Sequence, residues 1–454
     1  MKHSSNHTCL SGRQAQTKTD DYQTASVLPS KSGRLNKQIK HLSIILLTVI
    51  SCSLSAQKVY RTQIFDPNIK TLQIGVNDDK YLLPIIELNG SDILRIRFDE
   101  MSHEAHSYGY TVLHCNADWT ASNLSTNEYL TGFTTGNIID FALSQTTTFL
   151  YTHYKFELPN NDIGFKISGN YVVVIYEDNK VDSPIAQVCF SIVEPKVSIN
   201  ATIRGNTDTE LYGRLQQLDF DLMLNAYPVR DVNSELKIVI RQNNRLDNEV
   251  TGIQPTFISA SKLSYANNKA LIFEGGNEYH RFDISSIYSA SEGIAQIRYQ
   301  QPHYEVYLTQ DKIRTAKTYI DDFDVNGKFV INYQEAMENS DTEADYLYVH
   351  FVLPLKAPFF DGQLYLGGEL NYNLLNDHSR LKYDFNAGMY HKTLLLKQGG
   401  YNYQYLFVPK GAQKASVERV EGSYWQTKNE YTIYVFHRPW GERYDKLIGV
   451  KSIE

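Results

Sequence analysis

The chain is poor in several features that mark common classes of protein. Its 454 residues include only four cysteines, Cys9, Cys52, Cys115 and Cys189, which excludes a small disulfide-rich fold. No glycine-rich phosphate loop follows a strand-like run, and there is no Gly-x-Ser-x-Gly turn and no paired-carboxylate signature distinct from an ordinary acidic surface. No window of helical length keeps apolar residues at a spacing of about 3.6 residues. These absences argue against an enzyme and against a helical fold.

The one long apolar run is too short to cross a membrane. Two lysines precede apolar residues 42–50, and small residues follow as far as Ala56. A transmembrane helix needs about 20 apolar residues, so this pattern predicts a secretory signal peptide. We expect cleavage after Ala56; a lipidated N-terminus at Cys52 is the alternative. Residues 1–56, a leader plus this signal, are therefore left out of the prediction of the fold.

Removal of this segment leaves an acidic chain. Seven of the 44 basic and two of the 51 acidic residues lie in 1–56, so 37 and 49 remain, with a formal net charge of −12. Binding to the phosphates of nucleic acid requires a basic surface, and we expect no nucleic-acid partner. The remaining 398 residues exceed the size that one core usually serves, about 100–200 residues. The chain is therefore expected to contain several domains.

Most of the remaining sequence alternates apolar and polar residues with a period of two. Residues 94–99 alternate in this way and predict a half-buried strand, whereas 171–176 (YVVVIY) is apolar on both faces and predicts a central strand. Residues 236–241 and 431–435 predict further strands. Val325-Asn326-Gly327-Lys328 predicts a tight hairpin turn, because Asn and Gly tolerate positive φ. These patterns indicate an all-β chain of β-sandwiches.

The boundaries between domains are placed where strands end in proline or where charge concentrates. Val193-Glu194-Pro195 closes a unit of about the size of one sandwich, and the acidic run 335–345 marks a second boundary. We expect a first domain at 57–195, a middle domain at 196–345 and a C-terminal domain at 346–454.

Residues 110–133 hold the densest group of unusual side chains. His114 and Cys115 suggest a nucleophile and its base, but neighbours on a strand point to opposite faces and cannot address one substrate atom. Asn116 and Asp118 are expected to bond the backbone of their own turn. Trp119 lies in this turn and is a candidate for contact with a partner, although aromatic residues of β-proteins more often pack inside. For Cys115 and Cys189, separate buried thiols are favoured over a single disulfide bridge.

No metal site or cofactor site is expected. His103, His106 and His114 lie close together in the sequence without a recognisable ligand spacing. Residues 322–327 imitate the start of a calcium-binding loop, but Tyr333 stands where the loop needs its bidentate Glu.

At this point the sequence resembles a known family. The resemblance is to the first domain of the type IX secretion system plug proteins of Bacteroidota, and it continues through the rest of the chain after the signal. It is carried by the HCNADW core within 110–133 and the following N-x-x-x-x-x-Y-x-x-GF pattern, by YTHY at 151–154, SGNY at 168–171, YED at 176–178, RQN at 241–243 and DVNGKF at 324–329. Leu246 departs from the family pattern, which has Trp at that position.

The resemblance implies a protein without enzymatic activity that works in the periplasm. Such a plug binds the large outer-membrane translocon barrel of the secretion system and closes its periplasmic opening, touching the membrane only through the barrel. The residues that mark the family, and that we expect to serve as signature or partner contacts, are His114, Asn116, Asp118, Trp119, Tyr129 and Phe133.

A second resemblance concerns the C-terminal region. Residues 364–372, 389–390 and 400–405 are similar to early-set immunoglobulin-like domains that bind α-glucans in other proteins. This implies tandem immunoglobulin-like sandwiches after the signal peptide. It also leaves an alternative function open, a periplasmic or surface glycan-binding protein in which Tyr372 and Tyr390 stack on sugar rings.

Overall fold

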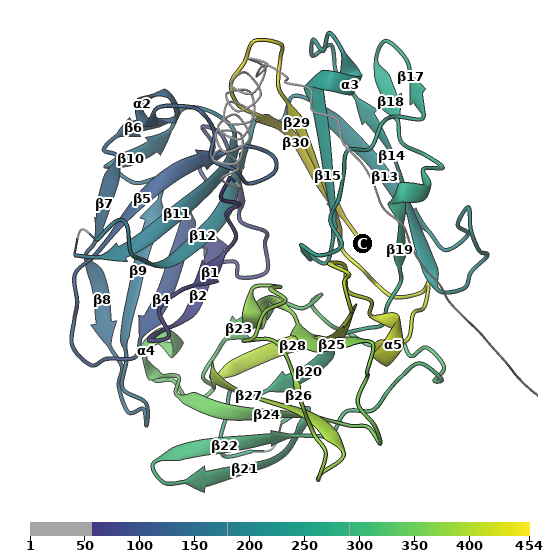
Figure 1. The fold of residues 1–454 in the computed structure, drawn as a ribbon. Helices are drawn as coiled ribbons and strands as arrows, with labels where there is room; N and C mark the ends of the chain where they lie inside the picture. Colours follow the sequence, from purple (N-terminus) through teal and green to yellow (C-terminus); the bar gives the residue numbers. More distant parts are fainter. Residues whose placement is uncertain (1–56, 179, 290) are drawn as a thin grey trace, which may run out of the picture. The chain divides into compact units, whose positions relative to one another are not determined.

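The structure is a computed structural model that describes residues 57–178, 180–289 and 291–454. The predicted signal peptide, its cleavage after Ala56 and the alternative at Cys52 lie outside the described residues. Residues 57–454 form one compact unit, built almost entirely of β-strands that pack as three sandwiches (Figure 1). The predicted all-β class of packed sandwiches is confirmed.

The first sandwich contains the strands up to residue 193. One sheet has the order β1-β12-β11-β5-β7, with β3 parallel to β12; its strands are β1 (Gln63–Ile64), β3 (Ile85–Glu87), β5 (Tyr108–Cys115), β7 (Thr135–Ile138), β11 (Gly169–Glu177) and β12 (Pro184–Val193). The facing sheet consists of β2 (Ile69–Val76), β4 (Leu94–Glu100), β9 (Thr152–Leu158) and β8 (Asp140–Leu143), in that order. Helix α2 (Thr126–Tyr129) and the short ladder of β6 (Leu130–Gly132) with β10 (Ile163–Phe165) close one end.

The second sandwich is assembled from two separate parts of the chain. One sheet contains β13 (Ser198–Arg204), β14 (Leu215–Met223), β17 (Phe257–Ile258), β18 (Lys262–Ser264) and β19 (Ile272–Glu274). The facing sheet contains β15 (Leu236–Gln242), β16 (Val250–Thr251), β29 (Tyr431–His437) and β30 (Lys446–Ile453). Helix α3 (Val232–Glu235) and the turn η1 (Lys269–Leu271) lie in its loops.

The third sandwich is inserted between β19 and β29. One sheet contains β20 (His280–Asp283), β23 (Phe329–Ile331), β25 (Gly362–Gly367) and β28 (Gly399–Pro409). The other contains β21 (Ile294–Gln300), β22 (His303–Leu308), β24 (Tyr346–Pro354), β27 (Met389–Lys397) and β26 (Lys382–Asp384). Helix α4 (Ser340–Glu343), the turn η2 (Glu369–Asn371) and helix α5 (Glu418–Glu421) complete it.

This grouping of strands differs from the contiguous middle and C-terminal domains expected at 196–345 and 346–454. Strand β29 pairs along its whole length with β15, from Leu236 opposite His437 to Gln242 opposite Tyr431, and their side chains share one core with β13 and β14. The reason is that the insertion of one sandwich into another produces no local sequence pattern. Pairing between strands this far apart in sequence produces no pattern that a short window can detect.

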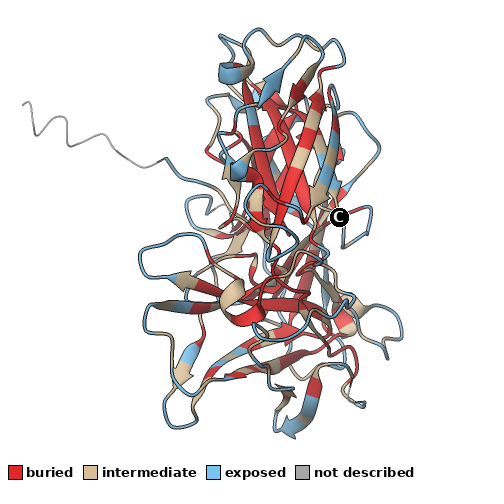
Figure 2. Cartoon of the chain, turned by 90° about the vertical axis from the view of Figure 1, so that its right-hand side faces the viewer, coloured by how far each residue is buried: buried red, intermediate tan, exposed pale blue. Residues whose placement is uncertain are grey.

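Strand β11 lies in the centre of its sheet, as its continuous apolar sequence predicts. It pairs with β12 on one side and β5 on the other, and its residues are nearly all buried. Figure 2 shows that buried residues gather on the strands of the chain and exposed residues in its loops. Strand β4 differs from the predicted half-buried strand because both of its faces are buried. Its polar face carries Arg97 and Asp99, which are 7% and 1% exposed. Residues of the third sandwich cover this face.

The turn at Asn326-Gly327 forms, but the predicted hairpin is wrong. Asn326 and Gly327 have φ values of 53° and 85°, and the Lys328 N–H donates to the Val325 carbonyl at 3.2 Å. Residues 309–325 before the turn form no strand, and β23 after it pairs with β28. The residue types therefore determine the turn, whereas tertiary packing determines the pairing.

A buried carboxylate joins the first sandwich to the third. Asp99 on β4 accepts hydrogen bonds from Lys397 Nζ at 2.5 Å and from the Tyr346 hydroxyl at 2.7 Å, and it lies 2.6 Å from His153 Nδ1. Asp99 and Lys397 are each 1% exposed. Burial alone would raise the pKa of Asp99, but Lys397 and His153 outweigh burial and the pKa lies below its usual range.

Aromatic and backbone groups extend this junction. The Tyr151 hydroxyl donates to the Ala344 carbonyl at 2.7 Å, and Lys397 Nζ lies 4.2 Å from the centroid of the Tyr151 ring. Asp345 accepts two backbone N–H groups of the first sandwich, from residues 148 and 149, at 2.8 and 3.1 Å. The charges of Asp99 and Lys397 are thus enclosed by rings and paired with each other, as buried charges must be.

A second buried cluster of charges lies around β20 and α5. His280 lies 3.0 Å from Asp311 and 3.1 Å from Glu421, and Arg314 Nε donates to Glu421 at 2.8 Å. Burial alone would lower the pKa of His280, but the two carboxylates outweigh it and raise the pKa to about 9.

The Asp99–Lys397 pair gives a first prediction. Asp99→Asn leaves the Lys397 ammonium buried without an opposite charge, which should lower the free energy of unfolding by about 3–5 kcal/mol. Lys397→Met should cost a similar amount, and the double variant should cost less than the sum of the two. Urea unfolding of residues 57–454 measures all three. Additive losses would show that the two side chains do not stabilise the junction as a pair.

The His280 cluster gives a pH prediction. The pKa of His280 is about 9 in the folded chain and about 6.5 in an unfolded one, so its stabilising charge is fully present below pH ~6.5 and is lost as the pH rises through about 9. The midpoint of thermal unfolding should therefore fall across this interval. His280→Gln should flatten that fall, and an unchanged slope in the variant would contradict the assignment.

Candidate functional site

The signature segment begins with two side chains on opposite faces of β5, as its strand geometry predicts. His114 lies on the core face, with ring contacts to Tyr171 at 4.9 Å and Tyr444 at 5.4 Å. It is 2% exposed, and burial lowers its pKa to about 4. Cys115 lies on the other face, beside Trp119, where burial raises the pKa of its thiol. The two groups therefore cannot act together as a nucleophile and its base.

Cys115 and Cys189 are separate thiols. Cys115 is opposite Asn170 on β11, Cys189 is opposite Val172 on the same strand, and β11 lies between their two strands. Two strand spacings amount to about 9.6 Å, whereas the Cα atoms of a disulfide lie about 4.4–6.8 Å apart. The favoured prediction of two unlinked thiols agrees with this geometry.

The block Ser168-Gly169-Asn170 packs against His114 and forms a hydrogen bond to the turn after it. The Ser168 carbonyl lies 3.3 Å from His114 Nε2. Gly169 has a φ of +143°, and a Cβ atom there would lie 2.4 Å from the same nitrogen. Asn170 Nδ2 donates to the Asn116 carbonyl at 3.0 Å. Only glycine fits at the middle position.

The polar turn that follows is closed by its own side chains. Asp118 accepts hydrogen bonds from the Thr120 N–H at 3.0 Å and from its hydroxyl at 2.6 Å. Trp119, which has a φ of +65°, is only 7% exposed and packs against Cys115, Val172 and Val174. The expected role of Asp118 in bonding its own turn is present, and Trp119 is a packing residue.

The same turn is held by the β29–β30 loop of the second sandwich. Arg438 Nη2 donates to Asn116 Oδ1 at 2.6 Å, and its Nε donates to Asp445 at 2.8 Å. Asp445, which is 0% exposed, also accepts the Ala117 N–H at 2.9 Å and Lys237 Nζ at 3.0 Å. The signature turn is therefore a joint between the first and second sandwiches.

The remaining signature residues divide between core and surface. Tyr129 at the end of α2 is 3% exposed and donates to the Val112 carbonyl at 3.2 Å. Phe133, four residues later, is 66% exposed. Of the six signature residues, only Phe133 presents a large apolar side chain to solvent.

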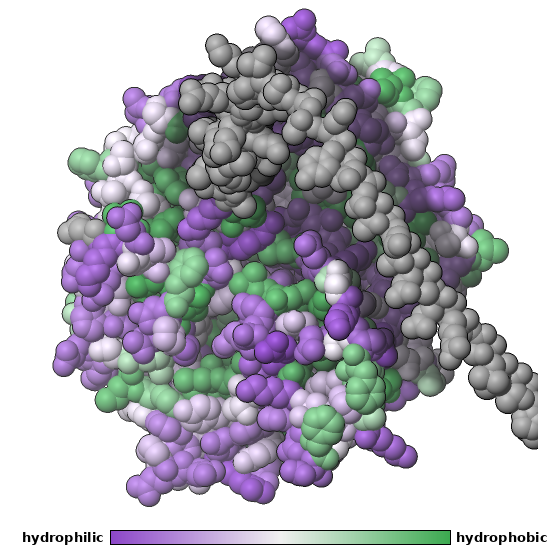
Figure 3. Space-filling model, in the orientation of Figure 1, coloured by the Kyte–Doolittle hydropathy of each residue, from purple (hydrophilic) through white to green (hydrophobic). Residues whose placement is uncertain are grey.

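Phe133 begins a run of exposed apolar side chains along the outer edge of the first sandwich. Ile139, Phe141, Leu143 and Leu150 are 83%, 48%, 40% and 55% exposed. Strand β8 is the edge strand of its sheet and pairs only with β9. Figure 1 shows β7 and β8 on the side of this sandwich that faces away from the others. On the face seen in Figure 3, apolar residues are interspersed with hydrophilic ones.

The two tyrosines of the glycan alternative are not on an open surface. Tyr390 is 5% exposed and packs against Tyr383 at 5.0 Å and Phe359 at 5.9 Å. The Tyr372 hydroxyl accepts the Leu72 N–H at 3.2 Å, at the junction with the first sandwich. Stacking on a sugar needs an exposed ring face; the Tyr390 ring is buried, and Tyr372 is half-buried at this junction.

The side chains considered for a metal have partners within the chain. His106 Nδ1 lies 2.6 Å from Glu100, and His103 Nε2 lies 3.1 Å from the Ser144 carbonyl. Asp324, in the segment that imitates a calcium loop, accepts backbone N–H groups. In the part of the chain that the structure describes, no cluster of His, Cys, Asp or Glu is placed to hold a metal ion, and no helix there is long and apolar enough to cross a membrane.

The residues that hold the signature turn from outside are not predicted by the sequence. Arg438 and Asp445 lie more than 300 residues away from Asn116, at the ends of the loop RPWGERYD. A charged and glycine-containing loop between two strand-like runs predicts a hairpin. It does not show which other part of the chain that hairpin contacts.

Two matched substitutions test whether the signature residues divide into buried packing residues and exposed surface residues. Trp119→Ala removes a buried ring and should lower the free energy of unfolding by about 3–5 kcal/mol. Phe133→Ala removes an exposed ring and should change it by no more than about 0.5 kcal/mol. Denaturant unfolding of the two variants and the parent protein gives the comparison. Equal losses would contradict the division into packing and surface residues.

Comparison with known proteins supports a family assignment. The family described as "Type 9 secretion system plug protein 1st domain" matches residues 69–194, which run from β2 to the end of β12. A crystal structure of a hypothetical protein from Parabacteroides merdae ATCC 43184 is similar to the chain, with 43% sequence identity and a TM-score of 0.86. The match covers 87% of this chain and 100% of that one.

Other similarities are too weak to interpret. The alkylpurine DNA glycosylase AlkC of Pseudomonas fluorescens, bound to DNA with an abasic site analogue, matches at 10% identity and a TM-score of 0.15, over 28% of this chain and 30% of its own. The receptor tyrosine kinase Torso matches at 11% identity and a TM-score of 0.11, over 53% and 82%. The search of curated proteins found no match. On the match of its first sandwich, the chain belongs to the type IX secretion system plug protein family.

Proposed function

We propose that this protein is a periplasmic plug subunit that binds the large outer-membrane translocon barrel of the type IX secretion system and closes its periplasmic opening without catalysing a reaction. Export by the N-terminal signal brings it to the periplasm, and its membrane contact is made through the barrel. The family assignment supports a role in type IX secretion. The plugging role rests on the physical properties of residues 57–454.

The observation that carries this proposal is the double anchoring of the first sandwich. Its β2-β4-β9-β8 sheet is fixed to the third sandwich through Asp99 and Lys397, and its signature turn is fixed to the second through Asp445 and Arg438. Breaking either joint would expose buried charges or leave them unpaired, which is costly. A body that closes an opening sterically must resist deformation, and these joints supply that resistance.

We further propose that the outer edge of the first sandwich contacts the barrel. The flat faces of its two sheets are already covered, one by the third sandwich at Asp99 and the other by the second at Ala117 and Val193. Strand β8 remains as an edge, and Ile139 and Phe141 are exposed on and beside it. An unpaired edge strand with apolar side chains is a common docking element for another strand.

The plugging role predicts a leak when the protein is lost. Deletion in a strain whose barrel lacks its other partners should admit a large antibiotic that the outer membrane normally excludes, and expression of the intact protein should restore the barrier. The measurement is the growth-inhibiting concentration of the antibiotic. An equally impermeable deletion strain would contradict the plugging role.

Variants in the same strain test the contact surface separately. Ile139→Lys with Phe141→Lys should lower co-purification of the barrel at least about tenfold, because apolar contacts at an interface centre are worth over 1 kcal/mol each. Phe257→Lys is the matched control: Phe257 is 60% exposed on the edge strand β17 of the second sandwich. Equal loss in both would contradict the assignment of the surface and leave the deletion result unaffected.

A further inference from the structure

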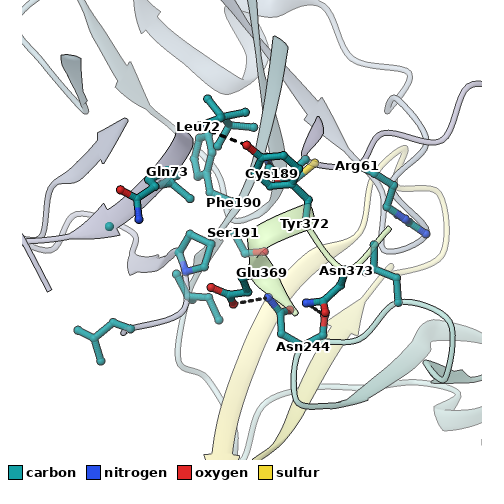
Figure 4. A pocket seen from close by; sticks show the side chains of 18 of the residues that line it. Arg61, Leu72, Gln73, Cys189, Phe190, Ser191, Asn244, Glu369, Tyr372 and Asn373 are labelled. Atoms are coloured by element: carbon teal, nitrogen blue, oxygen red, sulfur yellow. Dashed lines mark hydrogen bonds between the residues drawn. The ribbon is translucent and has the colours of Figure 1, made fainter. Parts of the chain in front are cut away.

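A cavity of about 140 Å³ lies where the three sandwiches meet. The first sandwich supplies walls from β2, β12 and the segment before β1, the second supplies Arg241 and Tyr434, and the third supplies Phe329 and Tyr372. Figure 4 shows Leu72, Phe190, Tyr372 and Glu369 close together, with Arg61 at one side of this group. No part of the proposed plug mechanism uses this cavity.

The charge around the cavity is unbalanced. Its lining contains four cations and a single carboxyl group, Glu369. Arg97 and Arg241 are neutralised from outside the lining, Arg97 by Asp78 at 2.5 Å and Arg241 by Glu249 at 2.7 Å. The two other cations are Arg61 and Lys80. In the described part of the chain neither of them lies within ion-pair distance of a carboxylate.

Arg61 has the greatest capacity for a new partner. The only hydrogen bond that its guanidinium donates to described residues goes from Nη1 to the Tyr60 carbonyl at 3.0 Å, and a guanidinium has five N–H donors. Burial lowers its pKa and Arg241 lowers it further, while Glu249 and Asp118 only partly oppose them. Lys80, in contrast, donates to the Ile331 carbonyl at 3.2 Å. An anion beside Arg61 would use its free donors.

The size and the walls of the cavity restrict the anion. A cavity of about 150 Å³ holds a molecule of the size of benzene. Apolar and aromatic side chains form much of the lining, namely Leu72, Ile74, Leu82, Val188, Phe190, Trp119, Leu246 and Tyr434. An inorganic ion would leave these walls in contact with water, whereas a small ring or branched chain would fill the space between them.

We infer that this cavity is a binding site for a compact organic anion, a carboxylate or phosphate monoester with an apolar body, whose charged group pairs with Arg61. Such a ligand contacts all three sandwiches and therefore stabilises their arrangement. The inference does not depend on the proposed plug function, because it concerns the isolated protein.

The test uses purified residues 57–454 and three probes: benzoate, phenyl phosphate and the neutral benzyl alcohol. Isothermal titration should show saturable binding of at least one anion and none of the alcohol, and that anion should raise the midpoint of thermal unfolding, because a ligand of the folded state stabilises it. The relative affinities of the two anions distinguish a carboxylate ligand from a phosphate ligand. Absence of binding by both anions, meaning a cavity that holds water only, would overturn the inference.

Three variants locate the site. Arg61→Gln should weaken binding of the anion by about tenfold or more, since a charge-assisted hydrogen bond is lost. Leu246→Trp places a larger side chain in the wall and should abolish binding without changing any charge. Arg230→Gln, at an exposed arginine outside the lining, should bind as the parent does. Each midpoint shift is measured against the same variant without ligand, and unchanged binding by Arg61→Gln would overturn the inference.

Discussion

The buried pair of Asp99 and Lys397 is the constraint on which the arrangement of the chain depends. Each residue is 1% exposed, and they come from different sandwiches. Removing either charge from water is costly, and only the presence of the other one in good geometry compensates. The first and third sandwiches therefore cannot slide against each other by small steps. They are either docked in this position or separated with both charges hydrated.

The signature turn imposes the same kind of constraint at the second junction. Asn116 and Ala117 form hydrogen bonds with the β29–β30 loop, and Asp445 accepts hydrogen bonds from both sandwiches. This explains why so many residues of unusual type occur in one short segment. Their positions are dictated by a joint, so a substitution such as Trp119→Ala acts on function through the fold. The side chains that a partner could contact lie outside the turn.

The sequence predicts the local part of this structure and misses the part that depends on distant contacts. The continuous apolar run correctly places the central strand β11, and alternation correctly places β4, β15 and β29, because side-chain direction on a strand depends only on its neighbours. It also separates His114 from Cys115. It assigns Arg97 and Asp99 to a solvent-facing side, because nothing near β4 in sequence reveals Lys397. The insertion of the third sandwich is missed for the same reason, and so is the pairing of β23 with β28.

The insertion itself contributes to the stiffness that the proposed plugging role requires. A sandwich appended to a chain end is held by one connection, but the third sandwich is entered after β19 and left before β29, so it is held by two. These connections are tied to each other, because Asn429 Nδ2 donates to the Gly275 carbonyl at 2.7 Å and to Gln216 at 2.8 Å. Two tied connections, together with the Asp99 junction, anchor the third sandwich on two sides. Rotation about either anchor would have to break the other, so in the proposed plug the free energy of contact with the barrel would not be lost to deformation of the chain.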